Sequence, residues 1–341
     1  MATENPSLTP YHDSKSSSRK DAEGELELPA YQPPTKGFLS KLPVSCVPYA
    51  QLMRLDRPAG FYAFYMPYVI GIAYAAAASE IRLPVSLLLN RASIYIVGCV
   101  FLRGAACTWN DNIDQDFDRQ VARCRLRPIA RGAVSTLQGH IFTAAQTLVG
   151  GLLLLALPVE CVFDAVPIAL LFALYPFGKR FTYYPQLILG FPFAGAIIMA
   201  SHSLYTNPFS SHNIIPTFCL VFANICWTMV YDTIYAHQDI EDDVKAGVKG
   251  MAVRFKDTTH LICSLLSVCV VGLMITTGIL SQLGPAYFIL SSGGTAASLG
   301  SMIVLVDLKT PSSCAWWFHW GFWFVGLSML SGLLAEYAGR F

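Results

Sequence analysis

The chain has 341 residues, of which 54% are hydrophobic and only 13% are charged. Soluble domains carry about a quarter charged residues, so this composition excludes an ordinary soluble protein and indicates an integral membrane protein. The formal net charge of +1 gives no sign of nucleic-acid binding. We therefore expect the lipid bilayer, and no nucleic acid, among its partners.

The N-terminal part, residues 1–44, is mostly polar and is expected to be a disordered cytosolic tail. It contains no apolar stretch of the kind found in a signal peptide. Its acidic residues, from Glu4 to Glu27, are not typical of a mitochondrial presequence, which is poor in acids. Residues 45–341 are expected to form one transmembrane domain.

Nine apolar segments follow the tail, each near the length of about 20 residues that a helix needs to cross a bilayer. They cover residues 59–79, 92–110, 137–157, 159–177, 186–205, 214–232, 259–281, 285–306 and 314–337. The expected fold class is therefore all-α, an integral membrane bundle of nine transmembrane helices.

The basic residues predict how this bundle is oriented. Most of the 23 Lys and Arg residues lie in the N-terminal part or in the loops after the second, fourth, sixth and eighth segments. Because basic residues concentrate on the cytosolic side, we expect a cytosolic N-terminus and a C-terminus on the opposite side. Both acidic clusters of the chain then face the cytosol.

The first acidic cluster, residues 110–118, ends the second apolar segment. On a helix, Asp111, Asp114 and Asp118 share one face, Asn110 borders it, and Asp116 points elsewhere. Like charges so placed repel each other, more strongly near lipid, unless a cation neutralises them. Since Mg²⁺ prefers carboxylates together with phosphate oxygens and water, the first hypothesis is a metal–diphosphate site.

The second acidic cluster, residues 232–243, ends the sixth apolar segment. Its Asp232, Tyr235, Asp239 and Asp243 again follow one helical face. Two such stripes at the same side of the membrane are expected to converge on one site, where two Mg²⁺ ions would neutralise six carboxylates. Two other interpretations stay open: solvated helix ends, and carboxylates along the cation path of a transporter.

Five stretches carry a family resemblance. They are residues 54–58 (RLDRP), 110–118 (NDxxDxxxD), 127–132 (RPIARG), 175–186 (YPxxKRxTxxPQ) and 232–243 (DxxYAxxDxxxD). In these motifs the chain resembles the UbiA superfamily of membrane prenyltransferases, in its 4-hydroxybenzoate polyprenyltransferase-like branch. The resemblance covers about residues 50–337. Gly250 departs from it, because that position usually carries Ser, and this leaves the detailed role of its loop open.

The resemblance implies a helical bundle with a central cavity that opens sideways to lipid and admits an isoprenoid tail. It implies Mg²⁺ as cofactor and a prenyl diphosphate as donor. The expected metal-binding and catalytic residues are Asp111, Asp114, Asp118, Asp232, Asp239 and Asp243. The expected substrate-binding residues are Asn110 at the metal–phosphate assembly, Arg127, Lys179 and Arg180 at diphosphate oxygens, Arg54 at an acceptor carboxylate, and Tyr235 at the head group or the prenyl cation. The basic residues among them also fit a topological role alone.

The expected activity is transfer of a prenyl group, farnesyl by resemblance to fungal meroterpenoid enzymes, to a carbon of a phenolic polyketide acid. The expected location is the endoplasmic reticulum, with the active site facing the cytosol. The alternatives are a 4-hydroxybenzoate polyprenyltransferase of ubiquinone biosynthesis in the mitochondrial inner membrane, a UbiA-like terpene cyclase, and a cation-coupled transporter. Neither the chain length of the donor nor the identity of the acceptor follows from the sequence.

Overall fold

The structure is a computed structural model that describes residues 31–339. Within this range, nine helical spans are long and apolar enough to cross a membrane. The prediction of an all-α membrane bundle is therefore confirmed. Residues 1–30 of the expected tail lie outside the described range. The described part of that tail includes the 3₁₀ helix η1 (Phe38–Lys41), in which Leu39 is buried.

The long helices follow the expected segments closely. They are α2 (Ala59–Ala78), α3 (Val85–Ile113), α5 (Thr136–Leu153), α6 (Glu160–Phe181), α7 (Pro185–Ser203), α8 (Ile214–Ala236), α11 (Thr259–Leu280), α12 (Gly294–Leu305) and α14 (Phe322–Gly339). Helix α3 begins at Val85 rather than at 92 and is the longest of these helices.

Shorter helices extend or connect the long ones. They are α1 (Val47–Leu52), α4 (Gln115–Asp118), η2 (Leu154–Ala156), η3 (His237–Asp239), α9 (Ile240–Ala246), α10 (Met251–Phe255), η4 (Lys256–Thr258), η5 (Tyr287–Gly293), α13 (Pro311–Trp316) and η6 (Trp317–Gly321). Of these, η5 and η6 are π-helices, which often mark functional sites.

Local sequence signals fix where several helices begin. Ser135 and Gln138 form a capping box at the start of α5, in which each side chain bonds the backbone of the other residue. Pro185 occupies the first position of α7, where its missing N–H is not needed. These signals set the residues at which α5 and α7 begin.

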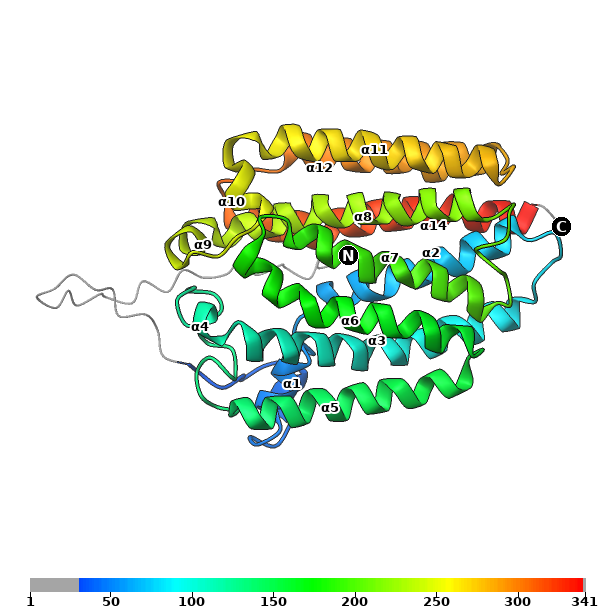
Figure 1. Ribbon diagram of the computed structural model, residues 1–341. Helices are drawn as coiled ribbons and strands as arrows, with labels where there is room; N and C mark the ends of the chain where they lie inside the picture. The colour runs from blue at the N-terminus through cyan, green and yellow to red at the C-terminus, as the bar shows by residue number, and fades with distance from the viewer. Residues whose placement is uncertain (1–30, 340–341) are drawn as a thin grey trace, which may run out of the picture. The chain divides into compact units, whose positions relative to one another are not determined.

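The centre of the bundle is made by α2, α7 and α8, whose spans are 67%, 61% and 61% buried, whereas the span that begins with α5 is 11% buried. A close crossing joins α2 to α7, because a Cβ at Gly71 would lie 2.8 Å from the Cα of Ile197. Small residues allow such approaches between membrane helices. In Figure 1, α11 and α12 flank one side of this centre and α5 lies at the other.

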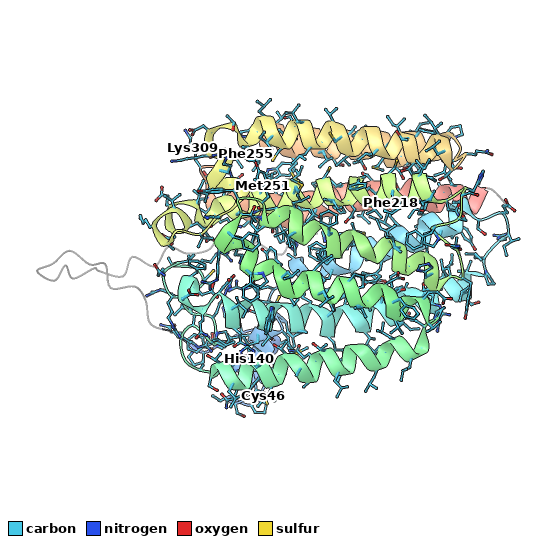
Figure 2. The ribbon with its side chains drawn as sticks, in the orientation of Figure 1. Cys46, His140, Phe218, Met251, Phe255 and Lys309 are labelled. Atoms are coloured by element: carbon cyan, nitrogen blue, oxygen red, sulfur yellow. The ribbon has the colours of Figure 1, made fainter. Side chains whose placement is uncertain are left out.

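One end of the bundle carries most of the short helices. Figure 1 shows α4, α9 and α10 together at the left end. Figure 2 labels Met251, Phe255 and Lys309 toward the same end, whereas Phe218 lies toward the other. Both acidic clusters belong to this end, since one includes α4 and the other includes α9.

Candidate active site

A cavity of about 620 Å³ lies at the end of the bundle that carries α4 and α9. Its walls come from the ends of α2, α3, α6, α7 and α8 and from α13 and η6. Carboxylates of both acidic clusters line its polar part, and three phenylalanines, Phe64, Phe172 and Phe193, line its apolar part. The cavity therefore suits a ligand with a charged head and an apolar tail.

The first acidic cluster does not form one continuous helix. Helix α3 ends at Ile113, Asp114 leaves the helical conformation with φ −92° and ψ 7°, and α4 begins at Gln115. The regular helix that the spacing assumed is therefore interrupted at Asp114. All three carboxylates nevertheless point inward, since Asp111, Asp114 and Asp118 are at most 6% exposed.

Two arginines hold the outer carboxylates of this cluster. Arg54, from the turn before α2, donates to Oδ1 of Asp111 at 2.6 Å. Arg127 donates to the same oxygen at 3.2 Å and to Oδ2 of Asp118 at 2.8 Å. The guanidinium groups thus reduce the repulsion between two buried carboxylates, which is strong where water is excluded.

Lys179, at the end of α6, holds the middle carboxylate. Its Nζ lies 2.5 Å from Oδ2 of Asp114 and 3.4 Å from Oδ1 of Asn110. The last turn of α6 therefore contacts the last turn of α3. Lys179 and Asn110 both line the cavity, as expected for residues near a diphosphate.

Arg103 fixes the position of Arg54. From within α3, its guanidinium donates to the carbonyl of Arg54 at 3.0 Å and to the carbonyl of Arg57 at 2.6 Å. Arg54 has a φ of +57°, in the left-handed region that costs a residue with a side chain about 1–2 kcal/mol. The bonds from Arg103 help to hold this turn in a shape that aims Arg54 at Asp111.

The second acidic cluster contacts the loop that follows α4. Arg123 forms an ion pair with Asp239, with its Nε 2.8 Å from Oδ1, and its Nη1 donates to the hydroxyl of Tyr235 at 3.0 Å. The backbone N–H of Ala122 donates to Oδ2 of Asp242 at 2.9 Å. The two acidic clusters, far apart in sequence, therefore lie side by side around one cavity.

Two other carboxylates of the second cluster, Asp232 and Asp243, form no ion pair within residues 31–339. Both line the cavity. Asp243 lies on α9, beyond the break that η3 makes in the helix. The helix is thus interrupted within the second cluster, but Asp232, Tyr235, Asp239 and Asp243 still line one cavity.

The density of negative charge affects how Asp118 ionises. Burial raises the pKa of Asp118 to about 6, and the nearby Asp111 adds to this effect, while Arg127 opposes it. An added positive charge in the cavity would favour the ionised form of this carboxyl.

The donor atoms present fit a hard divalent cation. Oδ2 of Asp111 and Oδ1 of Asp114 are buried and have no hydrogen-bond partner among the described residues. Carboxylate oxygens are the ligands that Mg²⁺ prefers in proteins. Across residues 31–339, no three His, Cys, Asp or Glu side chains are gathered closely enough to hold one ion. Four of the six carboxylates are instead paired with Arg or Lys side chains.

Comparison with known families identifies this arrangement. Residues 59–326 match the UbiA prenyltransferase family. The chain belongs to this family. A prenyltransferase from Acremonium egyptiacum, ascA, is 43% identical over 93% of each chain. The DMOA farnesyltransferase nvfB of Aspergillus novofumigatus is 46% identical over 75% of this chain and 80% of its own.

Solved structures of UbiA homologues share the fold. One from Archaeoglobus fulgidus, bound to GPP and Mg²⁺, aligns with a TM-score of 0.62 at 17% identity and covers 85% of this chain and 99% of its own. One from Aeropyrum pernix aligns with the same TM-score at 20% identity, over 80% and 97%. With the family match and the named relatives, the UbiA chain described here is an aromatic prenyltransferase. These matches favour a prenyltransferase over a cation-coupled transporter.

Arg180 does not occupy the position that the sequence suggested. It follows Lys179 on α6 but points outward, where it donates to both carboxylate oxygens of Asp116, at 2.8 and 3.0 Å. Both side chains are well exposed, and neither lines the cavity of this prenyltransferase. The expectation that Asp116 points away from the site agrees with this pair, whereas a diphosphate contact by Arg180 does not.

The motifs did not mark Arg123, Phe318 or His319, which line the cavity. Arg123 lies in the basic loop after the second apolar segment, where its charge alone indicated only topology, yet it pairs with Asp239. Phe318 and His319 lie on the π-helix η6, and Phe318 packs against Tyr235 with ring centroids 4.3 Å apart. No motif marked η6, but its run of aromatic residues, Trp316 to Trp320, was the available signal. Gly250 lines the cavity as well, and a Cβ there would meet only Gln186, at 3.6 Å.

Proposed function

We propose that this UbiA prenyltransferase transfers a farnesyl group from farnesyl diphosphate to a ring carbon of a phenolic polyketide acid, with Mg²⁺ as cofactor. The observation that carries the proposal is the single cavity in which carboxylates of both acidic clusters meet basic side chains at one end and aromatic side chains at the other. The choice of farnesyl is supported by the 46% identity to a relative named as a farnesyltransferase.

The six aspartates of the two clusters would hold the metal ions. They are Asp111, Asp114, Asp118, Asp232, Asp239 and Asp243. Bound Mg²⁺ supplies charge neutralisation that makes diphosphate a better leaving group. The unpartnered oxygens of Asp111 and Asp114 and the unpaired carboxylates of Asp232 and Asp243 support this assignment.

The basic residues of the cavity would bind the diphosphate oxygens. Lys179, Arg127 and Arg123 line the cavity, and each already holds a carboxylate of an acidic cluster. Charge-assisted hydrogen bonds from these groups are strong and position the donor head group. Arg54 is held against Asp111, so we assign it to supporting that carboxylate rather than to binding an acceptor carboxylate.

The aromatic side chains would stabilise the prenyl cation. When the C–O bond of the allylic diphosphate breaks, both electrons leave with diphosphate and a positive charge remains on the prenyl group. Tyr235 and Phe318 line the cavity, and aromatic rings attract such a charge. A ring carbon of the phenol then forms the new C–C bond, and the ring loses a proton.

We propose that the cavity faces the cytosol and that the enzyme resides in the endoplasmic reticulum. The excess of basic residues at the end that carries the acidic clusters supports the orientation. Glycosylation acceptor sites placed in the loop between α2 and α3 and, separately, between α3 and α5 test this. We expect modification only at the first position, and the reverse result would overturn the orientation.

The activity is tested with microsomes that contain the protein, several prenyl diphosphates and several phenolic acids, with products followed by mass spectrometry. We expect a farnesylated phenolic acid and diphosphate, and loss of product when EDTA removes divalent cations. A cyclised terpene without acceptor would support the cyclase alternative instead. A preference for 4-hydroxybenzoate with long polyprenyl donors would support the ubiquinone alternative.

A further inference from the structure

His319 is the one histidine among the described residues that line the cavity of about 620 Å³, which we call the reaction cavity. It lies on the π-helix η6 and is half-buried. Trp316 and Trp320, on either side of it in the sequence, are 46% and 48% exposed, as is usual for tryptophans at a membrane surface. Phe318 and His319 line the reaction cavity instead, so this stretch presents an imidazole to the ligands.

The level of His319 in the bundle follows from its neighbour in the chain. The ring of Phe318 packs on Tyr235, with ring centroids 4.3 Å apart. Tyr235 lies between Asp232 and Asp239 along α8 and η3. His319 therefore lies at the level of the second acidic cluster, where the diphosphate end of the donor would bind. An imidazole at this level is close to the reacting end of the donor rather than to the far end of its hydrocarbon chain.

The ring nitrogens of His319 are not engaged by the protein. Its ring contacts Trp320, with centroids 4.8 Å apart, but within residues 31–339 it takes part in no hydrogen bond or ion pair. Histidines elsewhere in the bundle differ, since His202 bonds Asp164 at 2.7 Å and His237 bonds Thr259 at 3.0 Å. A ligand in the reaction cavity can therefore reach an imidazole nitrogen without displacing another side chain.

Few other groups of the reaction cavity can accept a proton. The six carboxylates are assigned to Mg²⁺, and four of them are also paired with basic side chains. The other titratable side chains of the lining belong to Arg, Lys, Tyr and Cys residues. Arg and Lys groups are already protonated, and neutral phenols and thiols are weak bases. A neutral imidazole has one unprotonated nitrogen and changes charge between about pH 5 and 8, which suits proton transfer in neutral solution.

We propose that His319 is the base that takes the proton from the acceptor ring. This inference rests on the proposed prenyl transfer. After the allylic C–O bond has broken, a pair of ring electrons forms the new C–C bond, and the ring carbon then carries both the prenyl group and its hydrogen. When that C–H bond breaks, its electron pair restores the aromatic ring and the proton passes to the unprotonated nitrogen of His319. The imidazolium then gives the proton to water.

The first test replaces the imidazole by an amide, which keeps hydrogen-bonding atoms but is not a base. Removing a general base typically costs about 10²–10⁴-fold, so His319→Gln should lose at least about 10²-fold in turnover. His260 on α11 is exposed, bonds the carbonyl of Ile303 at 3.0 Å and does not line the reaction cavity, so His260→Gln is the matched control and should keep wild-type turnover. Wild-type turnover in His319→Gln would show that a carboxylate or diphosphate takes the proton, and the inference would be wrong.

An acceptor that carries deuterium at the alkylated ring carbon separates proton removal from a structural role. Loss of the base slows the step in which the C–D bond breaks, so the deuterium isotope effect on kcat should be larger in His319→Gln than in the wild type. Imidazole added to His319→Ala should restore part of the lost rate. A slow variant with the wild-type isotope effect and no rescue by imidazole would overturn the inference.

A third measurement uses the wild-type protein and depends neither on turnover nor on the folding of a variant. Diethyl pyrocarbonate acylates accessible neutral imidazoles, and mass spectrometry of peptides locates the label. We expect His319 to be labelled in the ligand-free protein and protected when Mg²⁺, a non-hydrolysable farnesyl diphosphate analogue and a phenolic acid are bound. Equal labelling of His319 in both states, in a protein that transfers prenyl groups, would overturn the inference alone. Absence of prenyl transfer by the wild type with every donor would overturn the proposed function and the inference with it.

Discussion

The two acidic clusters, residues 110–118 and 232–243, have similar spacing but hold their charges differently. In the first, Asp111, Asp114 and Asp118 are buried, and each is paired with a basic side chain. In the second, Asp239 pairs with Arg123, while Asp232 and Asp243 line the cavity with no ion pair within the described range 31–339. One sequence pattern therefore gives two different electrostatic settings.

Because the clusters differ in ion pairing, we expect the first to contribute to the stability of the fold and the second mainly to ligand binding. Removing one partner of a buried ion pair leaves an uncompensated charge, which costs about 3–5 kcal/mol. The first cluster is subject to this cost because its partners come from the turn before α2, from the loop after α4, and from α6. In the second cluster, Asp232 and Asp243 line the cavity and form no ion pair among the described residues. We therefore expect substitutions in the first cluster to affect folding and activity, and those at Asp232 or Asp243 to affect activity.

The largest effect is expected for Asp111→Ala. Arg54 loses its carboxylate partner and Arg127 loses one of two, so the free energy of unfolding should fall by about 3–5 kcal/mol. Prenyl transfer should fall by about 10³-fold, because one of the carboxylates proposed to hold the Mg²⁺ that would neutralise the leaving diphosphate is lost. Turnover in membranes and thermal unfolding in detergent measure the two effects. Wild-type unfolding combined with lost activity would show that the first cluster does not stabilise the fold.

Asp232→Asn should reduce prenyl transfer without reducing the stability of the fold. This carboxylate lies in the cavity without an ion pair, so the amide should leave the melting temperature unchanged or raise it. Prenyl transfer should still fall by about 10²–10³-fold, the usual cost of removing one group that stabilises a transition-state charge. A drop in melting temperature similar to that of Asp111→Ala would remove the distinction between the clusters.

The sequence predicted the nine helices and the residues of the two clusters, because apolar length and carboxylate spacing are local properties. It did not predict the breaks at Asp114 and at η3, since a regular helix was assumed throughout each cluster. It also did not predict the pair between Arg123 and Asp239, which are 116 positions apart. Spacing along a chain does not say which loops meet in space.

For the neighbouring residues Lys179 and Arg180, too, the sequence did not predict which side chain enters the cavity. Neighbouring residues on a helix point about 100° apart, so only one of the two can face the cavity. The sequence indicated that a basic residue of α6 reaches the diphosphate, but it did not say which. The packing of α6 against α3 decides it, because it turns Lys179 toward Asn110 and Asp114 and Arg180 toward Asp116.

A smaller effect is expected for Arg103→Gln, which acts on the first cluster through Arg54. The glutamine cannot make both bonds that Arg103 makes to the carbonyls of Arg54 and Arg57. A misplacement of about 1 Å at a positioning group can cost up to about 10²-fold in rate, so we expect a loss of that order or less. Arg103→Lys, which keeps the charge and one donor nitrogen, should recover part of it. Wild-type activity in Arg103→Gln would show that the left-handed turn at Arg54 holds without this support.

The smallest effect is expected for Asp116→Asn, which tests whether every carboxylate of the first cluster matters. Asp116 and Arg180 form an exposed pair, and the Arg180 hydrogen bond lowers the pKa of the Asp116 carboxyl. Exposed pairs contribute at most about 1 kcal/mol, so unfolding should change by less than that and prenyl transfer should stay near the wild-type rate. Asp114→Asn, two residues earlier and buried against Lys179, is the matched variant and should lose activity. Equal losses in both variants would mean that negative charge in this region, rather than its burial in the cavity, supports the reaction.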